Sequence, residues 1–456
     1  MFRTILRREI QDTCASSTLI SVMVTLTILV PLSAYIQARY YQRMVEDYAL
    51  RQSIHQTENS GQAIVLMRPL QPLSPLFNGA YYILPDEFRL RSDSATINSP
   101  SGDLMPLDWL FPKIDLSFLI GVLMTLLTIL LAHDSIAGDR EHGALKLILA
   151  GPVRRLTVLS AKLTGIILTT TVILIYMILL YATVVTVSTR GTVDLFGANL
   201  SALIVFTLVA ILVLIMMAAL GVAISASVRR SSTSLFVCAS IWTVITLIWP
   251  ILGPYVASSL KPAPVPEAAR RDVAAKEREL IQAELAEHRK TAADLKARRG
   301  EIESAWRQYL ELRRVWIERS DEEIGRLIRE RKKQIRDQQT FARRISLFSP
   351  YTAFREVLSS LCGTGLESYD EFLVAVERYR QQEFIPKGLD LLSRQKPWLS
   401  AEDSEERLRL SALQAPSPTL FERLSAAVWP LSILIVEMII LLAWGAISFE
   451  RYDVRV

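Results

Sequence analysis

Residues 195–227 read LFGANLSALIVFTLVAILVLIMMAALGVAISAS and contain no Asp, Glu, Lys or Arg. A helix needs about 20 consecutive apolar residues to cross the hydrocarbon core of a bilayer, so this stretch is long enough to span it. Five further stretches pass the same test, which predicts an all-α membrane protein with six transmembrane helices. These five are Cys14–Ile36, Leu116–His133, Val158–Val187, Leu235–Val256 and Ala426–Phe449.

The composition agrees with this interpretation. Of the 456 residues, 51% are hydrophobic and 21% are charged, and the two classes are segregated along the chain instead of mixed. The net charge of +5 is small for a chain of this length, so it does not favour a nucleic-acid partner. The three cysteines, Cys14, Cys238 and Cys362, match neither a zinc nor a redox spacing, and no disulfide framework is predicted.

The short segments between the apolar runs predict the orientation. Lys and Arg in short loops resist translocation, and here they gather in alternate segments. We therefore expect both termini in the cytoplasm of a bacterium and the chain in its inner membrane. The first run is longer than a signal-peptide core and no A-x-A site follows it, so we interpret it as an anchor. The basic residues of these segments are Arg3, Arg7, Arg8, Arg140, Lys146, Arg154, Arg155, Lys162, Arg229, Arg230, Arg451 and Arg455.

The remaining segments are expected in the periplasm. Long translocated segments escape the positive-inside rule, so the many arginines between the fifth and sixth spans do not contradict this topology. The predicted organisation is 1–36 (N-terminus and first span), 37–115 (periplasmic), 116–258 (spans two to five), 259–348 (periplasmic coiled-coil insert), 349–425 (periplasmic membrane-proximal helices) and 426–456 (sixth span and cytoplasmic tail).

The large insert carries apolar residues at helical spacing. Spacings of three and four, with charged residues between them, predict a coiled coil or a helical hairpin. The alternative is a long solvated helix that packs on nothing. The expected contact residues are Ile281, Leu285, His288, Ala292, Leu295, Ile302, Trp306, Tyr309, Leu312, Trp316, Ile324, Ile328, Ile335 and Ile345.

The loop between the second and third spans reads HDSIAGDREHGALKLILAGPVRR over residues 133–155. It begins with alternating acids and bases, continues as an amphipathic pattern and stops at Gly151-Pro152, a combination that ends helices. We predict one short helix over residues 134–150, lying parallel to the membrane. A short rigid helix of this kind could transmit a push from a soluble partner to the spans that it joins.

At these residues the chain resembles the ABC-2 class of ABC transporter permeases. The matching positions are Asp134, Asp139, Arg140, Glu141, Gly143, Leu145, Pro152, Arg154, Arg155 and Lys162. Ala144 and Ala150 stand where the family usually has Thr and Ser. Residues 68–76 with Gly79, and residues 349–350, 362–365 and 449–455, look like the subgroup of nitrous-oxide-reductase maturation and gliding-motility permeases. The likeness covers the membrane part, and the insert matches least.

The resemblance implies that the loop helix docks on a cytoplasmic ABC ATPase, which would hold ATP and Mg. It also implies a second permease copy or homologue, as a homodimer or heterodimer. The chain has no G-x-x-x-x-G-K-[ST] loop, and its four histidines are isolated, so no cofactor, metal site or enzyme activity is expected in this chain. Membrane lipid and a periplasmic protein are further expected partners, and nucleic acid is not.

Glu437 lies in the middle of the sixth predicted span, where an ionised carboxylate is costly. Two interpretations remain open, a functional role in a wet cavity and a structural hydrogen bond to a neighbouring helix. For the whole chain we expect the permease of an ATP-driven exporter. The alternatives are a mechanotransmitter or scaffold that acts through the insert, and a simple membrane tether. The predicted spans carry no charged ring, metal cluster or aromatic cage that would indicate a substrate.

Overall fold

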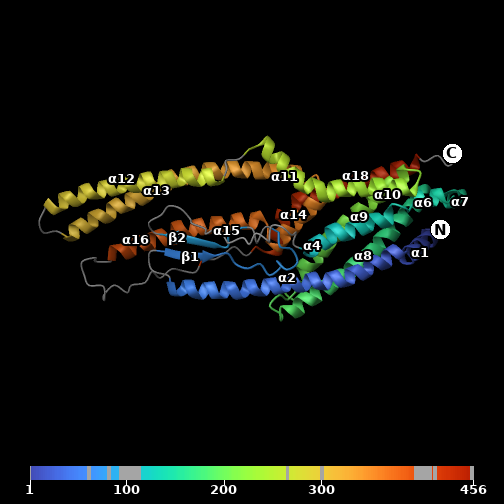
Figure 1. Cartoon of the computed structure of the whole chain (residues 1–456), viewed down its shortest axis with the longest axis horizontal. Coiled ribbons are helices and arrows are strands. Elements are labelled where there is room, and N and C mark those ends of the chain that lie inside the picture. The colour runs from blue at the N-terminus through green and yellow to red at the C-terminus, as the bar shows by residue number, and fades with distance from the viewer. Residues whose placement is uncertain are drawn as a thin grey trace.

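The computed structural model describes residues 2–58, 63–79, 84–91, 114–262, 266–297, 302–394, 413 and 418–451. The molecule is elongated, with a bundle of apolar helices at one end and a long helical arm at the other (Figure 1). Helix α1 (Phe2–Cys14) and the end of α18 (Val428–Glu450) both lie at the bundle end, opposite the tip of the arm. This arrangement agrees with an even number of membrane crossings.

Six helical stretches of the described chain are long and apolar enough to cross a membrane, which confirms the predicted number. The first, Ser17–Ile54, continues well beyond Ile36 within α2 (Ser17–Glu58), because residues 37–58 contain neither Gly nor Pro to end it. The second comprises α4 (Leu116–Phe118), the π-helix η1 (Leu119–Met124), α5 (Thr125–Ala132) and α6 (Ala137–Glu141). The others are α8 (Arg155–Ser188), α9 (Leu200–Ser227), Ser231–Leu260 and α18.

Helix α9 occupies the centre of the bundle, where it contacts α5, α8, α10 (Ser231–Thr243) and α18. A methyl group added at Gly221 would come within 2.5 Å of the Cβ atom of Ala132, so α9 and α5 meet almost backbone to backbone. Small residues allow such close packing between membrane helices, where apolar burial alone does not distinguish protein from lipid. The fifth span continues from α10 through η2 (Val244–Ile248) into α11 (Trp249–Leu260).

The other end of the molecule contains two strands, so the all-α prediction is wrong there. Strands β1 (Ala63–Met67) and β2 (Glu87–Arg91) pair antiparallel, and α15 (Leu366–Tyr379) packs on them through Phe372. In β2, Phe88 and Leu90 alternate with charged residues, a period of two that is typical of strands and could have revealed it. The chain continues from α15 into η3 (Arg380–Phe384) and α16 (Ile385–Arg394), whereas α14 (Pro350–Cys362) packs against α9 and α18 of the bundle and against α17 (Leu420–Ala426).

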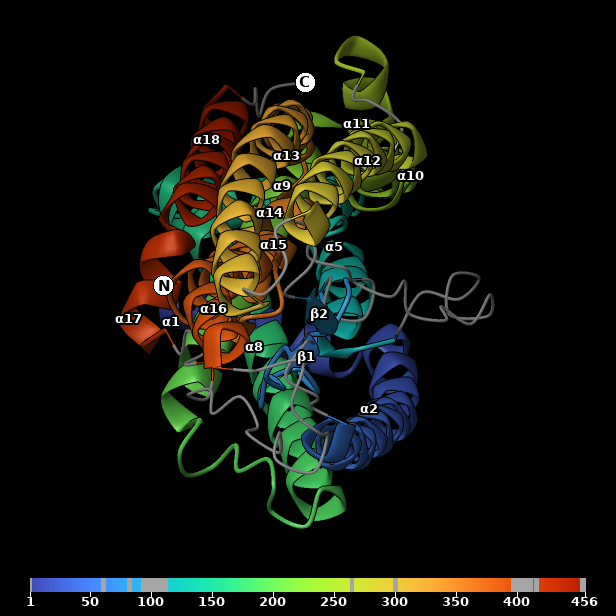
Figure 2. The same ribbon diagram turned by 90° about the vertical axis from the view of Figure 1, so that its left-hand side faces the viewer.

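The arm consists of α12 (Pro266–Ala297) and α13 (Ile302–Ser346), which run side by side (Figures 1 and 2). They pack through Leu280, Trp316 and Ile324, and the indole of Trp316 donates a hydrogen bond to Glu287 at 3.2 Å. The described part of the arm is therefore a helical hairpin and not a helix that packs on nothing.

The predicted contact stripe is correct on α13 at Trp316 and Ile324 but wrong on α12. There Ile281 and Leu285 are exposed, and the contact passes through Val273 and Leu280 instead. Adjacent apolar residues such as Leu280 and Ile281 lie about 100° apart on a helix, and only the partner helix decides which of them is covered. The side chains of His288, Ala292, Leu295 and Ile302 lie outside the described set.

Replacing Trp316 with Ala should unfold the arm locally and leave the bundle intact. Removing a buried Trp side chain costs about 3–5 kcal/mol, and α12 and α13 share only one small apolar cluster in their described part. Hydrogen exchange followed by mass spectrometry should show faster amide exchange in α12 and α13, with no change in α8 and α9. Val315→Ala, at an exposed neighbouring position, is the control. Unchanged exchange in the arm would contradict the assigned packing.

Candidate coupling site

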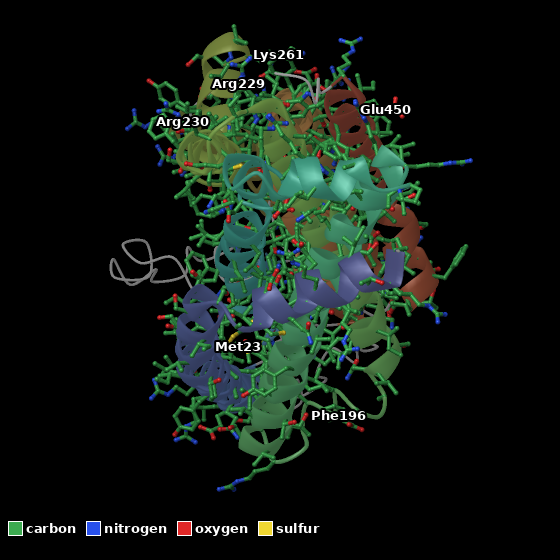
Figure 3. The ribbon with its side chains drawn as sticks, turned by 90° about the vertical axis from the view of Figure 1, so that its right-hand side faces the viewer. Met23, Phe196, Arg229, Arg230, Lys261 and Glu450 are labelled. Atoms are coloured by element: carbon green, nitrogen blue, oxygen red, sulfur yellow. The ribbon has the colours of Figure 1, made fainter. Side chains whose placement is uncertain are left out.

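The end of the second span and the loop after it form two short helices, α6 (Ala137–Glu141) and α7 (Ala144–Ala150), which lie across the end of the bundle beside α1 (Figure 3). The prediction of one helix over residues 134–150 is therefore wrong. Gly143 separates the two helices with a φ of +74°, a left-handed conformation that glycine adopts without steric cost. We call the segment from His133 to Gly151 the corner.

Two buried serines form hydrogen bonds that join the corner to the neighbouring spans. The hydroxyl of Ser225, in α9, donates to the carbonyl of His133 at 2.7 Å. The same oxygen accepts from the backbone N–H groups of Ile136 at 3.1 Å and Ala137 at 2.9 Å. Ser234, in α10, also donates to the carbonyl of His133 at 2.7 Å. The end of the second span is thereby bound to both the fourth and the fifth span.

The charged residues at the start of the corner bind the loop between α9 and α10. The guanidinium of Arg140 donates to the carbonyls of Ala226 at 3.0 Å and Val228 at 2.5 Å, at the C-terminal end of α9. The carboxylate of Glu141 accepts from the backbone N–H of Ser231 at 3.0 Å, at the start of α10. A cation at a helix C-terminus and an anion at a helix N-terminus are both favoured by the helix dipole.

Asp134 takes part in the same attachment, because its carboxylate accepts a hydrogen bond from the hydroxyl of Ser231. A methyl group at Gly138 would lie 2.3 Å from a carboxylate oxygen of Asp134, so the side chain folds back over the first turn of α6. The predicted residues Asp134, Arg140 and Glu141 therefore form internal bonds that hold the corner in place.

Lys162 joins the corner to α1 and α8. Its ammonium lies 2.7 Å from Asp139 and 3.0 Å from Glu9, and its side chain is only 6% exposed. Burial raises the pKa of Glu9, and the nearby ammonium of Lys162 opposes this shift. A methyl group at Gly165 would lie 2.9 Å from Cγ of Glu9, so α1 packs closely on α8.

Sequence reasoning missed both α1 and Glu9. Phe2, Ile5, Leu6 and Ile10 recur at helical spacing just before the first span, and this pattern could have predicted an amphipathic helix. It could not have predicted that Glu9 reaches Lys162, because the two residues are far apart in the chain.

The sequence pattern of the ABC-2 family transporter proteins matches residues 3–454, nearly the whole chain. The chain belongs to the ABC-2 transporter family. Family membership makes it the multi-pass permease component of an ABC transporter and implies association with ABC ATPase subunits. A comparison with curated proteins finds no match.

The remaining motif positions of this permease divide into anchors and exposed residues. Leu145 is fully buried against the ends of α5, α8 and α9, whereas Leu147 on the same helix is 79% exposed. Arg155 donates to the carbonyl of Glu450 at 2.6 Å and so binds the end of α18. Pro152 and Arg154 are exposed. The motif identifies Leu145, but only the fold shows that Leu147 is the leucine that a partner could reach.

Glu437 lies on α18, away from the corner, and the structure does not bring it together with the other predicted residues. Its side chain is half-buried, and its Oε2 atom has no hydrogen-bond partner in the described part of the permease. The structure therefore shows no bond from this oxygen to a neighbouring helix, which was one of the two interpretations.

Proposed function

We propose that this permease receives the movement of a separate cytoplasmic ATPase through its corner and exports a substrate. The observation that supports this most is the set of bonds that join the corner to four other helices. Lys162 links it to α1 and α8, and the serine and arginine contacts link it to α9 and α10. A push on α7 would then move these helices together, since each is bound to the same short segment.

The exposed residues of α7 are the proposed docking surface for the ATPase. Lys146 and Leu147 project from the bundle end, where Arg154 is also exposed. Arg229 and Arg230 are also exposed, directly before Ser231, whose backbone N–H binds Glu141 of the corner. ATP and Mg would bind to the ATPase and not to this chain. We also propose that the chain belongs to the subgroup of nitrous-oxide-reductase maturation and gliding-motility permeases, which its sequence resembles.

A second copy or homologue of the permease completes the proposed transporter. Helix α18 contributes a largely exposed apolar face that includes Val436, Ile440 and Trp444. In this proposal the face meets either lipid or the second subunit, and Glu437 on the same helix would face the path between subunits. Whether the pair is a homodimer or a heterodimer does not change the role of the corner.

The proposed topology places the corner and both termini in the cytoplasm and the arm in the periplasm. Cys14 is exposed at the end of α1 on the same side as the corner, whereas Cys238 and Cys362 are buried. Burial also raises the pKa of the Cys362 thiol and so lowers its thiolate content and reactivity.

We therefore expect a membrane-impermeant maleimide to label Cys14 in inverted membrane vesicles but not in intact spheroplasts. Labelling is measured by the mass shift of the purified chain. Cys14→Ser is the control, and both preparations of this variant should stay unlabelled because the other two thiols are covered. Labelling from the spheroplast side would reverse the proposed orientation.

A mechanotransmitter is the second candidate function, because the arm is attached directly to the fifth span. The indole of Trp249 in α11 donates to the carbonyl of Ile345 in α13 at 3.0 Å. The ammonium of Lys261 lies 4.9 Å from the centre of the Phe341 ring. Movement of the fifth span would be passed to the arm through these contacts, and the arm could act on a periplasmic protein with nothing crossing the membrane.

Shortening the arm distinguishes the two functions. Arg331 and Asp272 form an ion pair at 2.7 Å, so residues 273–330 can be replaced by a short Gly/Ser loop at a point where the helices already meet. In proteoliposomes with the cognate ATPase, we expect the shortened and full chains to stimulate ATP hydrolysis equally, since the corner is at the other end. Loss of stimulation would contradict the proposed site.

The same variant is then tested in cells that lack the chromosomal copy of the gene. Restored growth or resistance, whichever phenotype the deletion gives, supports an exporter whose distal arm is dispensable. Failure to restore the phenotype, with ATP hydrolysis still stimulated, supports the mechanotransmitter.

A further inference from the structure

An open pocket of about 430 Å³ lies where the fifth span, the arm and the helices beside it meet, far from the corner. Its lining comes from α11, α13, α14, the start of α15 and the segment with Phe77 and Gly79. The volume falls within the range of about 300–1,000 Å³ that is typical of small-molecule sites. Three arginines line it, Arg336 and Arg343 from α13 and Arg355 from α14.

The charges in this pocket are unevenly paired. Both Glu356 and Glu367 neutralise Arg343, at 3.0 Å and 2.5 Å. Arg336 is left with Asp370 at 3.9 Å, close to the limit of an ion pair. The pocket as a whole is balanced, with three guanidinium groups and three carboxylates, but one cation takes most of the negative charge.

Arg355 makes no ion pair with any residue in the described ranges of the chain. Its guanidinium lies 5.7 Å from the ring centres of Phe77 and Tyr351 and shares a hydrogen bond with the Tyr351 hydroxyl, while the side chain as a whole stays exposed. Asp115 is near enough to interact electrostatically, but its carboxylate accepts hydrogen bonds from the hydroxyl of Ser117 at 2.6 Å and the N–H of Phe118 at 2.9 Å. Arg355 and Arg336 can therefore donate to an incoming anion.

A helix N-terminus opens into the same pocket. Helix α15 begins at Leu366 after Gly365, and no side chain caps its first N–H groups. Both residues line the pocket. Uncapped N–H groups and the helix dipole attract phosphate-like anions, and here they do so beside two available guanidinium groups. Glu367 in the first turn offsets part of the dipole but is already paired with Arg343.

An apolar surface adjoins the polar one. Pro250 and Pro254 of α11 line the pocket, and Ile251 and Tyr255 next to them are largely exposed at the outer end of the fifth span. Phe348, in the turn between α13 and α14, is also largely exposed. A soluble anion needs no apolar surface beside its site, whereas a lipid presents a phosphate and acyl chains together.

We propose that this pocket binds the phosphate headgroup of an anionic phospholipid from the leaflet opposite the corner. Arg336, Arg355 and the start of α15 hold the phosphate, and the acyl chains lie along Ile251 and Tyr255. The bound lipid joins α11 of the fifth span to α13 of the arm. This inference does not depend on what the permease transports.

The test uses the purified full-length chain in detergent, with native mass spectrometry as the readout. The probes are dioctanoyl phosphatidylglycerol, dioctanoyl phosphatidylcholine and inorganic phosphate. We expect phosphatidylglycerol to bind at least about tenfold more tightly than phosphatidylcholine, because charge-assisted hydrogen bonds form only where the headgroup bears a net charge. Millimolar phosphate should not displace it, since phosphate alone lacks the apolar contacts.

Substitutions in the pocket test whether phosphatidylglycerol binds there. Arg336→Gln/Arg355→Gln should weaken phosphatidylglycerol binding about tenfold or more, and Arg336→Lys/Arg355→Lys should recover part of it. Arg329→Gln/Lys333→Gln, at exposed positions of the same helix beyond the pocket, is the matched control and should have little effect. Arg355→Gln alone affects an exposed side chain, so it keeps the test valid if the double variant fails to fold.

Three results would overturn the proposal. Equal binding by the double Gln variant would place the lipid elsewhere. Equal affinity for phosphatidylcholine would show apolar binding only. Displacement of the lipid by phosphate at similar concentration would show a site for soluble anions and not for lipid.

Discussion

Replacing Leu147 with Asp is expected to abolish co-purification of the ATPase subunit while leaving the permease folded. Leu147 is the most exposed large apolar side chain of α7, which makes it the proposed anchor in a groove of the ATPase. A carboxylate in such a groove would be desolvated without a partner. Central interface anchors are worth about 2–4 kcal/mol, so the affinity should fall about 30-fold to 1,000-fold.

The stability of the permease should change by no more than about 0.5 kcal/mol, because an exposed position loses no internal contact. Pull-down of the ATPase and thermal unfolding in detergent measure the two effects separately. Leu285→Asp makes the same change at an exposed leucine of the arm and should leave ATPase binding unchanged.

Leu145→Asp should instead affect the stability of the permease first. Leu145 is fully buried, so this change should lower the unfolding temperature before any effect on docking can be measured. Normal ATPase binding by Leu147→Asp would show that α7 is not the contact, whatever the behaviour of Leu145→Asp.

Replacing Lys162 with Met is expected to give a large loss of stability, because this residue of α8 joins the corner to α1. The ammonium is almost fully covered and serves two carboxylates, on Glu9 and Asp139. Removing one partner of a buried ion pair costs about 3–5 kcal/mol, because the remaining charge stays buried without compensation. Asp139 is 24% exposed, so water compensates in part and the lower end of this range is expected.

The measurement is the unfolding temperature of the purified chain, together with hydrogen exchange in α1. We expect faster exchange in α1, because Glu9 is its charged link to α8. Lys146→Met removes an exposed cation from the corner and should change neither quantity.

A compensating variant identifies the cause of the stability lost in Lys162→Met. In Glu9→Gln/Asp139→Asn/Lys162→Met no charge is left buried, so much of the lost stability should return. If the triple variant is as unstable as Lys162→Met, packing of the lysine stem and not its charge holds α1 in place.

The sequence by itself determined the six spans, because crossing a bilayer requires a long apolar stretch, and length and composition can be read along the chain. It also located the corner, since a charged motif that ends at Gly-Pro between two spans is a local pattern. At Gly143 the local sequence pattern no longer predicts the structure. Gly143 belongs to the motif, but the break that it makes between α6 and α7 depends on a left-handed backbone that a Gly only permits.

Only the tertiary structure decided which side chains face one another. It buries Leu145 and exposes Leu147, brings Glu9 to Lys162, and covers Leu280 where Ile281 was expected. In each case the sequence offers two chemically similar candidates or two distant charges, and the choice depends on the position of a second helix. Apolar length is a property of one segment, whereas burial and ion pairing are properties of two.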